Sequence, residues 1–461
     1  MANLASRLKK IRELGLAPAS ELSPREEEKK APVKPDVKTS AKKRLPPRSA
    51  PGRSAKTPES TAPIPGEFND WEAAGYQVLR RTLVKDMGSY GEIPAHLALL
   101  APDLEGKNNL QYEDFLFFDL ETTGLSGGAG TVAFLAAFGS FVTDKKSRVQ
   151  LHIDQFLLMD YPGEADFIAL VLDFIASKGN VYLSTYNGKT FDSQILKTRC
   201  LMNGFKPPVI KQLDLLYPAR RLWKRILYSC SQAVVEAEIL GIDRSDDVSG
   251  AFAPDIWFRF LRSRSSKKEQ PDTEEASLNL LAICNHNVRD ISGLAALFGA
   301  VVKIARDPLD GCGRYNGDSE HVAMMWRRAA RVLPAQSGLP VTETAKTARA
   351  LLELAAEDWP RASLRLALDD LRQGAREAGI TRLYELLYRG GVRLAGYKNT
   401  GLSGDFRIVC PDTVKALALR RLAIDARKYP GKLPAKTFLD TALSLESLPN
   451  GLREELTLFV T

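Results

Sequence analysis

Two acidic residues stand two positions apart at the end of an apolar stretch, residues 115–124 (FLFFDLETTG). The four residues before the first acid are wholly apolar, which predicts a strand that is buried on both faces. Alternation along a strand puts Asp119 and Glu121 on the same face. Two like charges in such a place repel unless a cation lies between them. Paired hard-oxygen ligands suit Mg²⁺ or Mn²⁺, so this stretch predicts part of a metal site.

A two-metal phosphoryl site needs about four carboxylates and a group that activates water. Residues 187–192 (NGKTFD) join an expected strand to an expected helix, which places Asp192 in the first helical turn. Alternatively, Asp192 only satisfies free N–H groups at the helix start. His286 and Asp290 are four residues apart in an apolar helix and therefore share one face; a plain hydrogen bond is the alternative for this pair. The three segments in this order predict one site.

The elements around these residues follow an α/β pattern. Strands are expected at 115–121, 132–139, 150–158 and 180–186, with a helix over 165–177 between the last two. Three antiparallel-looking strands followed by alternating helix and strand have the ribonuclease H-like order. The glycine-rich residues 124–131 could suggest a phosphate-binding loop. They lack the Gly-Lys-Ser/Thr ending, so a hairpin turn is the better interpretation.

The later part of the chain is expected to be helical. Helices are predicted at 190–203, 231–240, 254–262 and 278–305, with a polar surface loop over 263–277. From about residue 319 onward the pattern is wholly helical, and its paired helices suggest a degenerate tetratricopeptide-like domain without a fixed period. We therefore expect a basic tail at 1–66, an α/β domain at 67–310 and a helical domain at 311–461.

Charge is distributed unevenly along the chain. Residues 1–66 hold 15 basic and 7 acidic residues, whereas the remainder holds 49 of each. The Pro-, Ser-, Lys- and Glu-rich tail predicts disorder, apart from a short amphipathic helix over 4–14 that could dock on a partner protein. The tail is read as solvated, with loose contact to nucleic-acid phosphate as the alternative. Five scattered cysteines and the absence of a signal peptide or a long apolar run predict a cytoplasmic protein without membrane spans.

Three segments resemble the motifs of a known group. Residues 118–124 (FDLETTG), 187–192 (NGKTFD) and 286–290 (HNVRD) are similar to the three motifs of the DEDD exonuclease superfamily. Residues 213–223 (LDLLYPARRLW) and 238–250 (EILGIDRSDDVSG) are closer to its bacterial YprB-like branch of ribonuclease H-like proteins. The resemblance covers about residues 70–306. In that group the position four residues before the last Asp is often Tyr; here it is His286.

The resemblance implies a metal-dependent 3′–5′ exonuclease that hydrolyses DNA or RNA with two Mg²⁺ or Mn²⁺ ions. Asp119, Glu121, Asp192 and Asp290 would be the metal ligands, and His286 would activate the attacking water. Asp214 is assigned equally to the rim of the site and to structure. The alternatives are an inactive scaffold that binds nucleic acid or protein through the tail or the helical domain, and a general metallohydrolase acting on nucleotides.

Overall fold

A computed structural model describes residues 65–460, except for 89–90, 108, 125–129, 144–148, 266–270, 333–340, 393, 395–408 and 432. The predicted tail up to residue 64, with its helix over 4–14, and the predicted turn at 125–129 lie outside the described residues. The described part has one seven-stranded sheet with the order β1-β2-β5-β4-β3-β6-β7. Its strands are β1 Glu72–Gly75, β2 Val78–Asp86, β3 Phe115–Thr122, β4 Ala133–Thr143, β5 Val149–Leu158, β6 Tyr182–Thr185 and β7 Lys211–Asp214.

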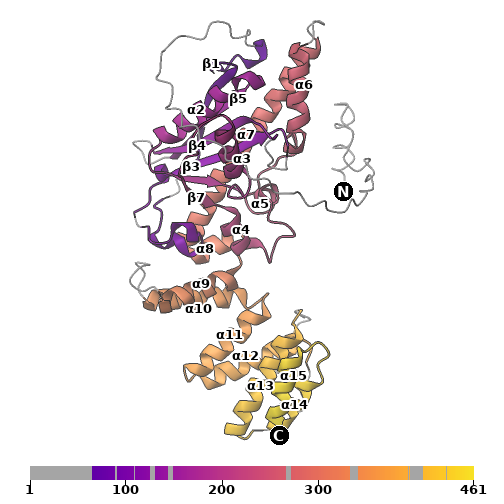
Figure 1. Cartoon of the computed structure of the whole chain (residues 1–461). Helices are drawn as coiled ribbons and strands as arrows, with labels where there is room; N and C mark the ends of the chain where they lie inside the picture. The colour runs from indigo at the N-terminus through magenta and orange to yellow at the C-terminus, as the bar shows by residue number, and fades with distance from the viewer. Residues whose placement is uncertain are drawn as a thin grey trace, which may run out of the picture. The chain divides into compact units, whose positions relative to one another are not determined.

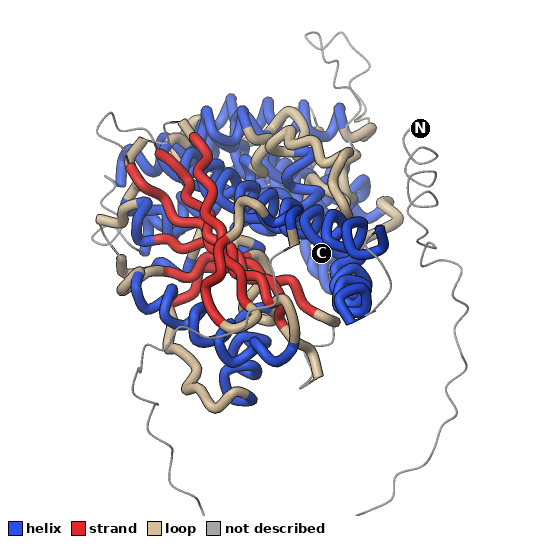
Figure 2. The backbone as a smooth tube through the Cα atoms, turned by 90° about the horizontal axis from the view of Figure 1, so that it is seen from above, coloured by secondary structure: helices blue, strands red, loops and turns tan. Residues whose placement is uncertain are grey.

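The sheet is mixed, as the pattern of strands and helices predicted. Strands β3, β4 and β5 pair antiparallel, and β2 extends this antiparallel half. Strands β6 and β7 run parallel to β3, so each is reached by a crossover, through α2 (Glu164–Ser177) and α3 (Asp192–Met202). Figure 2 shows the strands as one twisted sheet with helices on both of its sides. The fold is therefore the ribonuclease H-like α/β arrangement.

Strand β3 is buried on both faces because its apolar side chains alternate between two cores. Phe115 and Phe117 pack against Phe298, with ring centroids 4.4 and 5.8 Å apart. Phe118 lies on the opposite face and stacks on Phe138 at 4.9 Å. Alternation places Asp119 on the face of Phe117, which is the face that the long helix α7 (Pro271–Arg306) covers.

Two short helices, α4 (Leu216–Trp223) and α5 (Gln232–Glu238), precede α6 (Ala253–Ser265) and α7. The predicted polar loop over 263–277 is wrong at both ends, since α6 continues to Ser265 and α7 begins at Pro271. Proline is favoured at the first helical position, and the acids that follow it stabilise the helix N-terminus. Residues 271–277 of this stretch therefore form the first turns of α7.

The C-terminal region is helical, as predicted. Its helices are α8 Pro308–Arg314, α9 Ser319–Val332, α10 Val341–Ala355, α11 Pro360–Arg372, α12 Arg376–Arg389, α13 Asp412–Lys428, α14 Ala435–Leu443 and α15 Asn450–Val460 (Figure 1). The core beneath the sheet continues through Trp326 and Leu351 to Leu366, whereas Leu383, Leu419 and Phe438 belong to a separate core. Within the described residues no helix has the length and apolar character that a membrane span needs.

Candidate metal centre

Strand β3 presents the first two predicted ligands on one face of the sheet. Asp119 lies opposite Ala137 of β4, and Glu121 lies opposite Leu135, with an irregularity in the pairing directly after Glu121. The Glu121 side chain is buried although it carries an ionisable group. A carboxylate at the end of a central strand is held by the rigid backbone of the sheet, so its direction is well defined.

Asp192 is the first residue of α3, and Asp214 shapes the turn that leads to it. Asn187 in this turn has φ of 62°, a left-handed conformation that Asn tolerates. Asp214, which is 1% exposed, accepts hydrogen bonds from the backbone N–H groups of Asn187 at 2.8 Å and of Leu216 at 3.1 Å. These contacts give Asp214 a structural role: it holds the turn from which Asp192 reaches the site.

Helix α7 supplies His286 and Asp290, which do lie on one face. The imidazole Nε2 of His286 is 3.1 Å from Asp290 Oδ2, and its Nδ1 is 2.9 Å from Asp247 Oδ2. Asp247 belongs to the segment before the short 3-10 turn Gly250–Phe252. A Cβ atom on Gly250 would lie 2.9 Å from His286 Nε2, so a glycine is needed where this segment passes the ring.

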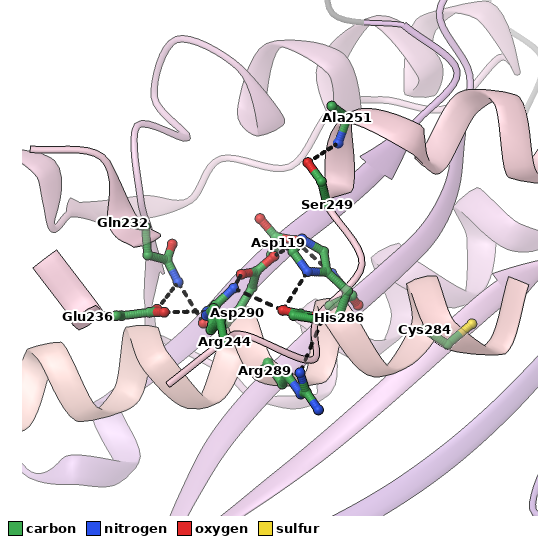
Figure 3. A network of polar contacts seen from close by, with 12 residues as sticks. Asp119, Gln232, Glu236, Arg244, Ser249, Ala251, Cys284, His286, Arg289 and Asp290 are labelled. Atoms are coloured by element: carbon green, nitrogen blue, oxygen red, sulfur yellow. Dashed lines mark hydrogen bonds and ion pairs between the residues drawn. The ribbon is translucent and has the colours of Figure 1, made fainter. Parts of the chain in front are cut away.

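Arg244 lies between Asp290 and Glu236 and contacts both, as Figure 3 shows. Its guanidinium is 2.5 Å from Asp290 Oδ1 and 2.5 Å from Glu236 Oε2. Burial raises the pKa of Glu236 to about 7, although the Arg244 charge acts in the opposite direction. Both oxygens of Asp290 are thus in contact with a nitrogen of the protein, one from Arg244 and one from His286.

A chain of side-chain hydrogen bonds connects Asp119 on β3 to Arg81 on β2. Asn287 Nδ2 donates to Asp119 Oδ2 at 2.7 Å, and Gln155 Nε2 donates to Asn287 Oδ1 at 2.8 Å. Arg81 Nε in turn donates to Gln155 Oε1 at 2.7 Å. Ala137 lies between Asp119 and Gln155 in the strand register, and its small side chain leaves room for the amides. The chain fixes the direction in which Asp119 points.

The carboxylates of the site act strongly on one another. Burial is the main cause that raises the pKa of Asp119 and of Glu121 well above the usual range, and the charges of Asp290 and Asp192 add to it. Burial also raises the pKa of Asp192 to about 7, while hydrogen bonds from the backbone of Leu120 and of Asp192 itself oppose the shift. The four predicted carboxylates are therefore brought together from β3, α3 and α7.

This donor set fits a divalent cation. One oxygen each from Glu121 and Asp290 and one ring nitrogen of His286 lie within 4.8 Å of one another. Carboxylate oxygens are the ligands that Mg²⁺ and Mn²⁺ prefer, and a bound cation would favour the ionised form of these buried acids. The His286 ring nitrogen thus lies next to the carboxylate oxygens that would bind the cation.

Sequence reasoning missed four contributors to the site: Gln155, Glu236, Arg244 and Asp247. A polar Gln155 directly before the apolar residues 156–159 (FLLM) was a readable signal. Asp247 and Arg244 lie in the segment 238–250, which the resemblance marked without assigning a role to any residue. Asn287 was noted only as a polar neighbour of His286.

Comparison with known proteins gives matches over the part of the chain that holds the site. Residues 116–302 match a family model described as the RNase H superfamily. The chain is also 32% identical over 287 residues to a Bacillus subtilis (strain 168) protein named "Uncharacterized protein YprB", and the match covers 61% of each chain. The resemblance to ribonuclease H-like and YprB-like proteins is thereby confirmed, whereas the DEDD assignment stays a prediction. The segment that matches the RNase H superfamily model, residues 116–302, contains all five predicted site residues.

Proposed function

We propose that the protein is a metal-dependent nuclease that hydrolyses phosphodiester bonds of DNA or RNA as a 3′–5′ exonuclease. The observation that supports this most is that Asp119, Glu121, Asp192 and Asp290, one buried and three half-buried, act on one another within the segment that matches the RNase H superfamily model. Like charges that are held close together destabilise the folded state. Carboxylates with pKa values raised in this way cluster at functional sites.

The four carboxylates would hold two Mg²⁺ or Mn²⁺ ions. Such ions, when bound, lower the pKa of the attacking water and neutralise charge on the leaving oxygen. Asn287 keeps Asp119 directed into the site through its 2.7 Å hydrogen bond. Asp192 enters from α3, so the substrate phosphate would lie between the end of β3 and the start of α3.

His286 is our candidate for the group that accepts a proton from the attacking water. Asp247 Oδ2 faces Nδ1 at 2.9 Å, which fixes the ring and leaves Nε2 on the side of Glu121 and Asp290. A carboxylate behind a histidine orients the ring and makes the other nitrogen a better base. Asp247 is in this proposal a positioning residue, because it acts through His286.

One observation favours the alternative, an inactive ribonuclease H-like scaffold that binds nucleic acid or protein. Arg244 contacts Asp290 Oδ1 while His286 contacts Asp290 Oδ2, so both oxygens of this ligand already have partners within the protein. In a scaffold these contacts would be permanent. In a nuclease Asp290 exchanges one of them when it binds an ion.

The test is hydrolysis of end-labelled single-stranded DNA and RNA oligonucleotides with Mn²⁺. Wild type is compared with Asp119→Asn and Asp192→Asn, which keep the side-chain shape, and with Asp255→Asn, an exposed acid of α6, as the matched control. We expect losses of at least about 10³-fold for the two site variants and none for the control. Shortening one nucleotide at a time from the 3′ end supports the polarity.

Equal activity in wild type and both site variants would reject the nuclease. Binding of the oligonucleotide without any turnover by wild type, over a range of Mn²⁺ and Mg²⁺ concentrations, would favour the scaffold.

A further inference from the structure

A second charged feature lies away from the sheet, in a cavity between α9 and α11. Its volume is about 450 Å³, within the range of roughly 300–1,000 Å³ that is usual for small-ligand sites. Four arginines line it: Arg327 and Arg328 from α9, and Arg365 and Arg372 from α11. Met324 and Leu368 give it an apolar part, and Asp369 is the one acid among its described lining residues.

The positive charge of this arginine-lined cavity is only partly balanced. Asp369 forms an ion pair with Arg327 at 2.6 Å and a longer one with Arg372 at 3.4 Å. Arg365 pairs with the buried Glu320 at 3.1 Å. Arg328 is exposed and has no ion pair among the described residues, and the Arg372 side chain is 69% exposed. Arg328, together with Arg372, which shares Asp369 with Arg327, is therefore the part of the lining most open to an anion.

The shape and chemistry fit a nucleotide unit. A guanidinium binds two phosphate oxygens at once and also stacks on the face of a base. Apolar side chains beside such a fork offer contact area for the base or the sugar. A bare cluster of solvated arginines on a convex surface would have neither the concave form nor the apolar part.

We propose that this cavity is a second binding site for single-stranded nucleic acid, with phosphates on Arg328 and Arg372 and a base against Met324 and Leu368. The choice of nucleic acid over an acidic peptide rests on the proposed nuclease function of the same chain. Trp326 and Val322 of α9 belong to the core beneath the sheet, so the cavity is built on helices anchored to the RNase H superfamily domain. A strand bound here stays tethered to the protein, which raises its effective concentration at the carboxylates.

The test measures binding alone. Full-length protein is titrated into a fluorescein-labelled 20-nucleotide single strand in EDTA, so that no hydrolysis occurs, over a series of salt concentrations. Arg328→Ala/Arg372→Ala is compared with Arg361→Ala, an exposed arginine of α11 outside the cavity lining. We expect the double variant to bind about tenfold more weakly and to lower the slope of log K against log salt by about 1.4, since each phosphate contact on a single strand contributes about 0.7.

The conservative variant Arg328→Lys/Arg372→Lys keeps the two positive charges but removes the planar guanidinium groups, which can each bind two phosphate oxygens. We expect it to retain the salt slope and to lose part of the affinity, which a folding defect would not produce. Wild-type affinity in both double variants, or an equal loss in Arg361→Ala, overturns the proposal. Displacement of the oligonucleotide by polyglutamate at equal charge would instead indicate an acidic protein partner.

These outcomes are separable from those of the nuclease test. Oligonucleotide binding that depends on Arg328 and Arg372 without any Mn²⁺-dependent hydrolysis rejects the nuclease and keeps the cavity site. Hydrolysis by a protein whose binding is indifferent to both arginines rejects the cavity site and keeps the nuclease.

Discussion

Acidic side chains are placed in opposite ways in two regions of this chain. At the end of β3, Asp119 has a neutral amide as its hydrogen-bond partner, and its nearest charges are other carboxylates. In the C-terminal helices, Asp370 is 3% exposed and accepts hydrogen bonds from Arg349 at 2.7 Å and from Arg382 at 2.9 Å. One region concentrates like charges, and the other pairs opposite ones.

The difference separates a functional arrangement from a structural one. An ion pair offsets part of the free energy that a buried charge loses with its water, so the Asp370 cluster is compatible with stability alone. Among the described residues neither Asp119 nor Glu121 forms an ion pair, and burial together with the neighbouring carboxylates raises the pKa of both. A fold retains an arrangement of this kind where it serves a ligand or a reaction.

The largest expected effect is that a substitution at Asp119 removes activity but increases the stability of the metal-free protein. Asp119→Asn should abolish hydrolysis, by about 10³-fold or more, yet raise the free energy of unfolding in EDTA at pH 8 by about 1 kcal/mol, because a repelling charge is removed. Asp370→Asn should leave hydrolysis unchanged and lower the free energy of unfolding by roughly 2 kcal/mol, less than a fully buried pair because its arginines are partly exposed. Urea unfolding and the oligonucleotide assay measure the two quantities on the same samples. If Asp119→Asn destabilises the metal-free protein as much as Asp370→Asn does, the contrast between the regions fails.

A smaller effect is expected at Asn287, which reaches Asp119 from α7. Asn287→Ala leaves the Asp119 carboxylate without its donor, and we expect a loss of about 10- to 100-fold in activity, as for other residues that orient metal ligands. The matched control is Asn285→Ala, two residues earlier on α7, which removes a contact to Arg81 and none to Asp119. The ratio of kcat between the two variants at saturating Mn²⁺ is the measurement. Equal losses would show that the Arg81 end of the amide chain matters as much as the Asp119 end.

The sequence predicted the parts of this site that depend on local geometry. A strand period of two was enough to place Asp119 and Glu121 on one face, and a helical period did the same for His286 and Asp290. The order of strands and helices was enough for the ribonuclease H-like fold. Each of these inferences uses residues only a few positions apart, where backbone geometry determines which side chains are neighbours.

Contacts between distant segments were beyond this reasoning. Asp247 meets His286 across 39 residues, and Gln155 meets Asn287 across 132. Arg244 has no role in the sequence analysis, and only the fold places it between Glu236 and Asp290. The start of α7 was missed for another reason: a polar, acidic helix start has the composition of a loop, and only its proline at the first position distinguishes it.

The smallest effect that still tests the comparison is the pH dependence of stability without metal. The pKa of Asp192 is about 7 in the folded chain against an ordinary value of 3.8. Between these values the folded state binds a proton at Asp192 that the unfolded state has lost. The contribution of this group to the free energy of unfolding therefore falls as the pH rises from about 4 to 7 and levels off above. We expect Asp192→Asn to reduce this fall by about 1 kcal/mol, as measured by urea unfolding in EDTA.

Asp370→Asn is the control from the other region, and it should lower stability by a similar amount at pH 5.5 and pH 8, leaving the slope of wild type intact. Addition of Mn²⁺ at pH 8 should remove the fall in wild type, because a cation favours the ionised acids, and should do less in Asp192→Asn. A pH dependence that is the same in wild type and in Asp192→Asn would mean that the carboxylates of the site are compensated within the protein after all. The two regions would then differ in their partners and not in their energetics, and the case for a site at the end of β3 would lose its electrostatic support.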